Sequence, residues 1–151
     1  MPLSDTADTT ELAVFAAAVD DFMRAARRAR GRLARVGELS LSQFHLLEPL
    51  RTADAPLGVG ELAAAAEVSA PTATRMLATL ERDGLIERRG CPHDRRVVHV
   101  ALTAEGRRRL ESKRDSIAAR RAAVFASLTP AERREAARLL ERLAAATEDL
   151  R

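Results

Sequence analysis

The chain has 151 residues, of which 46% are apolar but only 3% aromatic, so leucine and alanine must form most of its core. This length corresponds to one domain, and the composition favours helices. The formal charge is +3, and the single cysteine excludes an intrachain disulfide framework. No window is apolar enough to span a membrane, and the polar, acidic N-terminus differs from a signal peptide. We therefore expect a cytoplasmic protein with no membrane partner.

A long amphipathic helix is predicted over residues 10–35, because apolar side chains recur there at three- and four-residue spacing. A second helix begins after Ser40, which forms a capping box with Gln43, and Pro49 should kink or end it. Its apolar positions are Leu41, Phe44, Leu47 and Leu50. Residues 52–56 are expected to form a loop.

A helix-turn-helix is predicted from Gly58 to Gly84. Gly58 and Glu61 begin its first helix, and a three-residue turn leads to Ser69, a good N-cap for the second. The second helix buries one face, made of Ala73, Met76, Leu77 and Leu80. The opposite face carries small side chains, hydroxyl groups and arginines, which can lie close against DNA. Gly84 is suited to the left-handed conformation that ends a helix.

Two strands, 85–89 and 97–102, follow and form a β-hairpin, because they are rich in β-branched residues. The connecting loop is basic and turn-forming. Thr103 then caps a helix that runs to about residue 127, and Thr129 with Pro130 begins a last helix over 129–150. This order of elements is a winged helix-turn-helix, here residues 40–109, flanked by a long helix at each end.

Positive charge is concentrated in this unit: residues 69–109 hold nine arginines and five acidic residues, giving +4, and the remainder carries −1. Such a distribution is typical of nucleic-acid binding. Arg75 can read guanine bidentately in the major groove, whereas Arg88 and Arg95 suit phosphate contact or support of the loop. The candidate DNA-binding residues are Ser69, Pro71, Thr72, Thr74, Arg75, Arg88, Arg95 and Arg96.

Three stretches, 39–47, 59–89 and 92–106, resemble the MarR (multiple antibiotic resistance regulator) family of bacterial transcription factors. The most specific is the Asp-Arg-Arg at 94–96, followed by a strand and Leu-Thr-x-x-Gly. The resemblance implies a dimer with a recognition helix in each major groove. It also implies that Arg96 of the wing enters the minor groove, with Asp94 orienting it by a salt bridge. Cys91 departs from the family, which more often has Asp or Asn there.

The outer helices, 10–35 and 129–150, have more apolar face than a winged unit of about 50 residues covers, which predicts a homodimer. Two recognition helices about one DNA turn apart would read a palindromic operator. The resemblance further implies a small aromatic or phenolic effector that releases a repressor from DNA. Its pocket is expected near Phe22, Phe44 and His45.

Enzymatic activity is not expected, because no catalytic or phosphate-binding motif occurs. Cys91, His93 and His99 are too few and too scattered for a zinc site, so we expect no metal or cofactor. Two alternatives remain: a regulator controlled by oxidation of Cys91, which arginines would activate, or a winged-helix module for protein–protein contact. The sequence thus predicts a mainly α protein with a small β-hairpin wing, dimerised through its N- and C-terminal helices.

Overall fold

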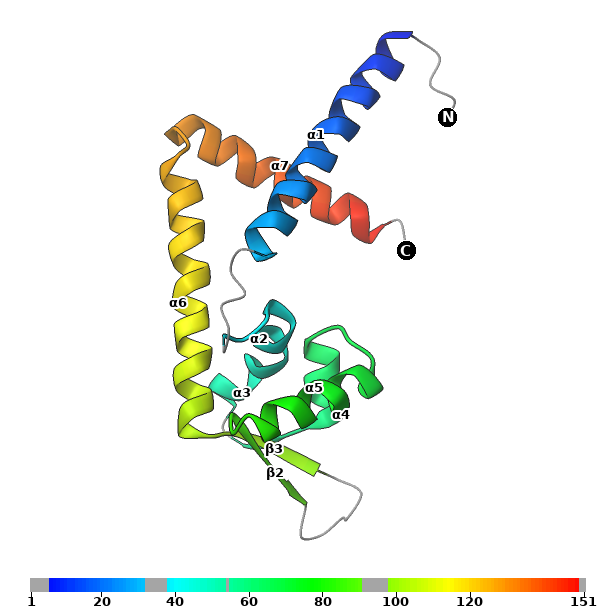
Figure 1. Cartoon of the computed structure of the whole chain (residues 1–151). Coiled ribbons are helices and arrows are strands. Elements are labelled where there is room, and N and C mark those ends of the chain that lie inside the picture. Colours follow the sequence, from blue (N-terminus) through cyan, green and yellow to red (C-terminus); the bar gives the residue numbers. More distant parts are fainter. Residues whose placement is uncertain (1–5, 32–37, 54, 91–97, 150–151) are drawn as a thin grey trace. The chain divides into compact units, whose positions relative to one another are not determined.

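The computed structural model describes residues 6–31, 38–53, 55–90 and 98–149, within two compact units, Met1–Ser40 and Leu41–Arg151. The first unit contains α1 (Thr6–Gly31). The second contains, in order, α2 (Leu41–Leu47), α3 (Pro49–Thr52), β1 (Leu57–Gly58), α4 (Val59–Ala65), α5 (Ala70–Arg82), β2 (Ile86–Gly90), β3 (Val98–Leu102), α6 (Ala104–Ala126) and α7 (Pro130–Glu148) (Figure 1).

The helix α1 begins at Thr6, four residues before the predicted start at 10. Asp8 in its first turn favours this earlier start, since a carboxylate there interacts well with the helix dipole. Residues 32–35 of the predicted helix lie outside the described residues. Its large apolar side chains are 39–67% exposed; they are Leu12, Val14, Phe15, Val19, Phe22 and Met23.

Proline divides the next helical segment as predicted. The helix α2 ends at Leu47, and Pro49 occupies the first turn of α3, where its missing N–H is not needed. Of the predicted inward positions, Phe44, Leu47 and Leu50 are buried and Leu41 is half-buried. The core of the second unit centres on fully buried side chains from α2, α4, α5, β3 and α6: Leu46, Leu47, Leu62, Leu77, Leu80, Val100 and Leu110.

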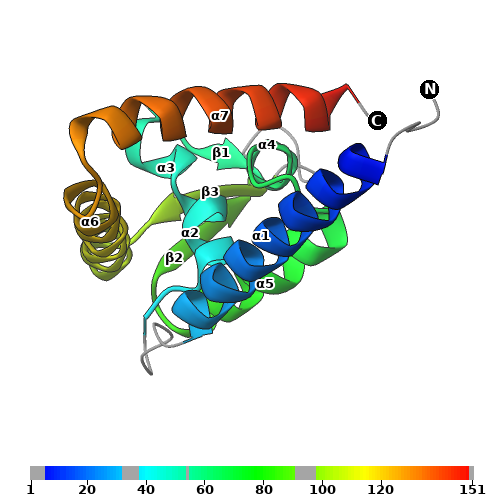
Figure 2. The ribbon, with the colours of Figure 1, turned by 90° about the horizontal axis from the view of Figure 1, so that it is seen from above.

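The wing is the edge of a three-stranded antiparallel sheet with the order β1-β3-β2 (Figure 2). The predicted hairpin pairs Ile86 with Leu102 and Arg88 with Val100. The prediction missed β1, where Leu57 pairs with Val100, because two residues are too short to show strand alternation. The strand β2 begins four residues after the end of α5, so the position of the wing is tied to that of the helix.

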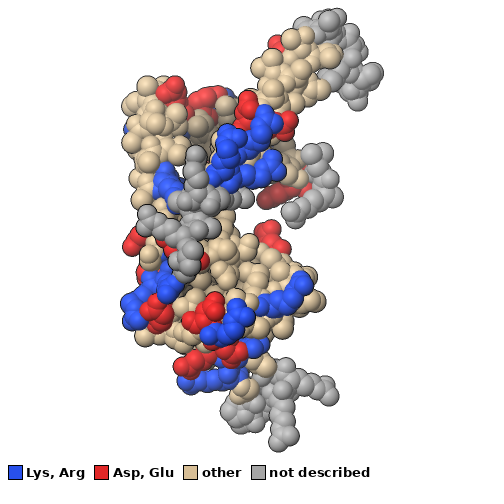
Figure 3. Space-filling model, in the orientation of Figure 1, with Lys and Arg blue, Asp and Glu red and all other residues tan. Residues whose placement is uncertain are grey.

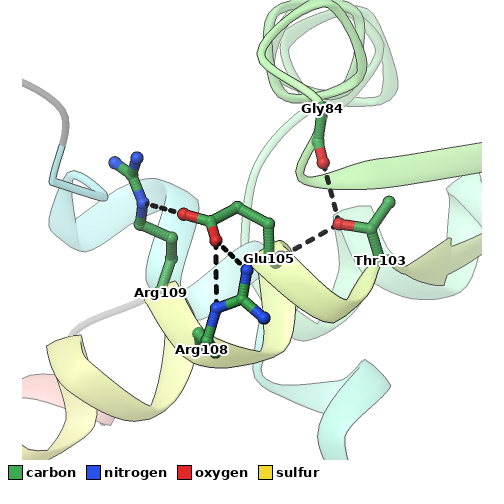
Figure 4. Close-up of polar contacts among 6 residues, drawn as sticks. Gly84, Thr103, Glu105, Arg108 and Arg109 are labelled. Carbon is green, nitrogen blue, oxygen red and sulfur yellow. Dashed lines mark hydrogen bonds and ion pairs between the residues drawn. The ribbon is translucent and has the colours of Figure 1, made fainter.

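A set of contacts that we call the Thr103 joint connects the end of α5 to the start of α6 (Figure 4). The Thr103 hydroxyl donates to the Gly84 carbonyl at 2.8 Å and accepts from the Gly106 amide at 3.0 Å. The Thr103 amide donates to the Leu85 carbonyl at 3.1 Å. Gly84 has φ +72°, the predicted left-handed conformation, and a Cβ on Gly106 would lie 1.9 Å from the Leu85 oxygen. Glycine is therefore required at both ends of this joint.

The last two helices begin and end close to the predicted residues. Thr129 forms the predicted capping box: its amide donates to Glu132 at 2.8 Å, and its hydroxyl accepts from the Glu132 amide at 3.3 Å. The backbone hydrogen bond lowers the pKa of Glu132. Beyond Leu110, α6 has no buried side chain, and none of the side chains that the structure describes on α7 is buried.

Replacing Gly106 by alanine should destabilise the protein, because the new methyl group would overlap the Leu85 carbonyl. We expect a loss of about 1–3 kcal/mol or more in the free energy of unfolding, measured by chemical denaturation. Gly60→Ala is the matched control, since nothing lies within 4 Å of its added methyl group. Equal stability of the two variants would contradict the close approach at Gly106.

Candidate nucleic-acid interface

The outward face of α5 carries most of the predicted DNA-binding residues. The opposite face is fully buried at Ala73, Leu77 and Leu80. The helix therefore packs on the core through that face and leaves its outward face to solvent. Of the predicted contacts, Thr72 is half-buried, and the others are exposed to solvent: Ser69, Pro71, Thr74 and Arg75. The structure therefore brings these five residues together at the first two turns of the helix.

The Thr72 hydroxyl is the centre of a small polar network on this face. It accepts from the Ser69 hydroxyl at 2.9 Å and from the Arg75 guanidinium at 3.4 Å. The Ser69 hydroxyl in turn accepts from the Thr72 amide at 3.4 Å, which confirms the predicted N-cap. Thr74 donates to the Ala70 carbonyl at 2.8 Å. Because a hydroxyl has one donor and two acceptor sites, Thr72 retains its proton for an external acceptor such as a phosphate or a base.

Arg88 lies within the winged helix-turn-helix, residues 40–109, which we call the lobe, and it contacts an acidic residue there. Its Nε donates to the Glu81 carboxylate at 2.7 Å, and a second guanidinium nitrogen contacts the same oxygen. Its side chain is 29% exposed, so the pair is partly shielded from water. The hydrogen bond from Arg88 lowers the pKa of Glu81. This pair ties the last turn of α5 to the wing strand β2. The choice between phosphate contact and support of the loop for Arg88 stays a prediction.

The arginines at the tip of the wing belong to residues 91–97, which lie outside the described residues. This group includes Asp94, Arg95 and Arg96, together with Cys91 and its predicted redox role. The strands that carry this loop are described: β2 ends at Gly90 and β3 begins at Val98. Their pairing fixes where the wing leaves the lobe.

Acidic side chains accompany many of the basic ones. Arg89 pairs with Glu87 at 2.7 Å on the exposed side of β2. At the start of α6, Glu105 accepts from Arg109 at 2.7 Å and from Arg108 at 3.1 Å, and these two contacts lower the pKa of Glu105 (Figure 4). Figure 3 shows basic and acidic side chains lying next to each other on the face in view. The local positive field is thus smaller than the arginine count indicates.

The three residues of the predicted effector pocket have different environments. Phe44 is buried in the core, with its ring edge-on to that of His45 at a centroid distance of 5.5 Å. His45 is exposed, and Phe22 belongs to α1, in the other unit. The grouping of Phe22, Phe44 and His45 as one pocket therefore stays a prediction.

Within the described ranges, no three His, Cys, Asp or Glu side chains lie close enough to hold a metal ion. Cys91 and His93 of the zinc hypothesis are outside those ranges. Each helix of the part that the structure describes is too short or too polar to cross a bilayer.

The positioning role of Glu81 was not predicted from the sequence. Nothing in the spacing shows that a residue in the last turn of α5 meets one seven positions later, because the meeting depends on how β2 leaves the Gly84 turn. Thr103 and Gly106 were easier to identify from the sequence. Both belong to the Leu-Thr-x-x-Gly signature, which the structure shows to be the Thr103 joint.

Residues 39–98 match the model of the MarR family. This match extends from just before α2 to the first residue of β3, so this part of the chain is similar to the MarR family. The chain is 40% identical over 74 residues to the HTH-type transcriptional repressor YetL of Bacillus subtilis (strain 168), a match that covers 48% of this chain and 44% of YetL. The matches to the two curated relatives span 46% and 44% of their lengths, so the chain covers about half of each.

Solved structures extend the similarity to nearly the whole chain. The YusO protein from Bacillus subtilis is 27% identical with a TM-score of 0.72, covering 94% of this chain and 99% of YusO. BpsR of Bordetella bronchiseptica is 25% identical with a TM-score of 0.64, covering 83% and 98%. These similarities confirm the predicted winged helix-turn-helix of the MarR type.

The Glu81–Arg88 pair predicts a pH-dependent contribution to stability. The folded pKa of Glu81 is below the ordinary value of 4.5, so the pair stabilises the fold at neutral pH and loses its effect as the pH falls through that lowered pKa. The thermal midpoint of wild type should therefore exceed that of Glu81→Gln at about pH 7 and approach it towards about pH 3.

Glu87→Gln serves as the control, since its partner Arg89 is 78% exposed and exposed pairs contribute little. A gap between wild type and Glu81→Gln that stays constant with pH would contradict an ion-pair role.

Proposed function

We propose that this chain binds double-stranded operator DNA as a homodimer and regulates transcription, acting as a repressor. The observation that carries the proposal is the exposed network of Ser69, Thr72 and Arg75 on a helix whose opposite face is fully buried. Such a helix presents fixed hydrogen-bonding groups at its N-terminal end, where recognition helices contact base edges. The similarity to the repressor YetL over 74 residues supports repression rather than activation.

Each element has a distinct role in this proposal. The first turns of α5 lie in the major groove, where Arg75 contacts a guanine and Thr72 and Thr74 contact bases or phosphates. Arg96 enters the minor groove, oriented by Asp94, and Arg95 contacts the backbone. Arg88 acts through Glu81, holding the wing against α5. Phosphate contacts position the protein, and base contacts specify the sequence.

Exposed apolar side chains on α1, α6 and α7 support the homodimer. On α7, Leu139, Leu140 and Leu143 are 41–59% exposed, and at the end of α6 Val124 and Phe125 are 64% and 57% exposed. Surfaces of this kind are typical of protein–protein contacts. A twofold dimer would present two recognition helices about one DNA turn apart, which fits a palindromic operator.

We further propose that a small aromatic or phenolic ligand releases the protein from DNA. An open cleft lies between Glu67 at the α4–α5 turn and α7, with Leu140, Leu143, Ala144 and Thr147 in its wall. A ligand that binds one spacing of the recognition helices better than another would shift the dimer towards that spacing. BpsR, whose DNA binding is regulated by 6-hydroxynicotinic acid, supports this proposal.

The same proposal places the protein in the cytoplasm, where it would reach chromosomal DNA. It includes no catalytic activity, cofactor or metal, because the curated relatives are transcriptional regulators.

Fluorescence anisotropy on DNA from upstream of the protein's own gene tests the operator proposal. Wild type should bind a duplex with two half-sites far more tightly than one half-site, and scrambled DNA about a thousandfold more weakly than the operator. Arg75→Ala should weaken binding by about 5- to 150-fold, because it removes a bidentate base contact. Arg96→Ala should also weaken binding and reduce the salt slope by roughly one.

Arg121→Ala is the matched control, since this exposed arginine lies on the distal part of α6, away from α5. It should bind as wild type does. Equal affinity of wild type for operator and scrambled DNA would leave only a basic surface and overturn the proposal.

Titrating the protein–operator complex with small aromatic acids tests ligand release. Anisotropy should fall with a saturable dependence on one acid, and Thr147→Gln in the cleft wall should shift that midpoint at least about tenfold. The operator affinity of the variant without ligand is the internal control. A complex that no aromatic or phenolic acid dissociates would contradict this mechanism.

A further inference from the structure

The corner between α6 and α7 is held by one arginine. The helix α6 ends at Ala126, α7 begins at Pro130, and Arg133 lies in the second turn of α7. Its guanidinium carbon is 3.8 Å from the centroid of the Phe125 ring, and its Nε donates to the Phe125 carbonyl at 2.8 Å. Arg133 therefore contacts both the side chain and the backbone of the last turn of α6.

Both contacts are chemically favourable at this position. The last carbonyls of a helix have no partner within it, and a cation there interacts well with the helix dipole. The Phe125 carbonyl also accepts from the Leu128 amide at 3.3 Å, so one oxygen joins the helix end, the turn and α7. A planar guanidinium that both stacks on a ring and donates a directed hydrogen bond allows little variation in angle. The angle between α6 and α7 is thus restricted to a narrower range than a three-residue turn alone would allow.

Little else fixes α7 relative to the DNA-binding lobe. Gly106 and Leu110 are the buried residues of α6, and both belong to its first two turns at the Thr103 joint. Of the side chains described on α7, none is buried within the single chain, and the cleft at Glu67 separates it from the α4–α5 turn. Figures 1 and 2 show α7 running across the end of the straight helix α6. The path from the lobe to α7 therefore runs through α6 and its corner.

We propose that Arg133 is a positioning residue whose contacts with Phe125 set the angle between α6 and α7 and, through it, the separation of the two recognition helices in the dimer. This inference rests on the homodimer of the proposed function. The helix α6 has 23 residues and spans roughly 34 Å, so a change of about 10° at its corner moves its other end by roughly 6 Å. That distance approaches two base-pair steps of about 3.4 Å each. A small change at Arg133 is thus large enough to take the recognition helices out of register with an operator.

The test is a distance measurement between protomers by pulsed electron paramagnetic resonance. A spin label is attached to Ala78→Cys, on the exposed face of α5, in a Cys91→Ser background, which leaves one label per chain. Arg133→Gln should broaden or displace the distance distribution by roughly 6 Å relative to the parent protein. Arg134→Gln, which removes the same charge at an exposed neighbouring position, should leave the distribution unchanged. Arg133→Lys should resemble Arg133→Gln, because a lysine keeps the charge but has no planar guanidinium.

Sedimentation and thermal melts of the same samples separate the outcomes. Folded, dimeric Arg133→Gln with the parental distribution would overturn the inference and leave the homodimer intact. A parent protein that sediments as a monomer would overturn the homodimer and this inference with it. If Arg133→Gln fails to fold, Arg133→Lys tests the same inference. A distance distribution in Arg133→Lys that equals the parental one would also contradict the role of the guanidinium.

Discussion

The winged helix-turn-helix lobe depends on the contact between the Thr103 hydroxyl, the Gly84 carbonyl and the Gly106 amide. One hydroxyl stabilises both the left-handed turn that ends α5 and the N-terminus of α6. The approach of Gly106 to the Leu85 carbonyl excludes any side chain there, so the contact is steric as well as polar. The strand β2 begins directly after Leu85, and β3 ends directly before Thr103. The contact therefore positions α5, the wing and α6 relative to one another. The end of α5, the wing and the start of α6 therefore meet at this one set of contacts.

Ion pairs within the chain occupy several arginines of the basic segment, residues 69–109. Glu81, Glu87 and Glu105 each accept hydrogen bonds from arginines, and Arg82 lies 3.6 Å from Asp83. On α5, Arg75 contacts the Thr72 hydroxyl, whereas Arg82 lies close to a carboxylate. A lobe that neutralises most of its own cations loses non-specific attraction to phosphates and keeps the contacts that distinguish one sequence from another. The arrangement is thus suited to selective rather than strong general binding.

The sequence predicted those parts of the fold whose causes lie within three or four residues. The Ser69 and Thr129 caps, the buried face of α5 and the conformation of Gly84 all follow from local spacing, and the structure confirms them. Contacts between elements were harder to predict: β1 is a two-residue strand defined by its partner, and the Glu81–Arg88 pair needs the crossing of β2 over the end of α5. The same holds for side-chain burial, since Phe44 is buried in the core while His45 next to it is exposed.

The long helix α6 carries polar residues on all sides past Leu110, a pattern that packing in the core does not explain. Past Leu110 its side chains are half-buried or exposed, and charged residues occur on all sides, so packing on the lobe does not explain its length. Val124 and Phe125 are largely exposed in the single chain, and the Phe125 ring lies under the Arg133 guanidinium. A helix that is fixed to the lobe at its first turns and to α7 at its last turn behaves as a rigid spacer between the two. A polar surface suits such a spacer, because a helix that is polar on all sides can bridge two parts of a protein through solvent.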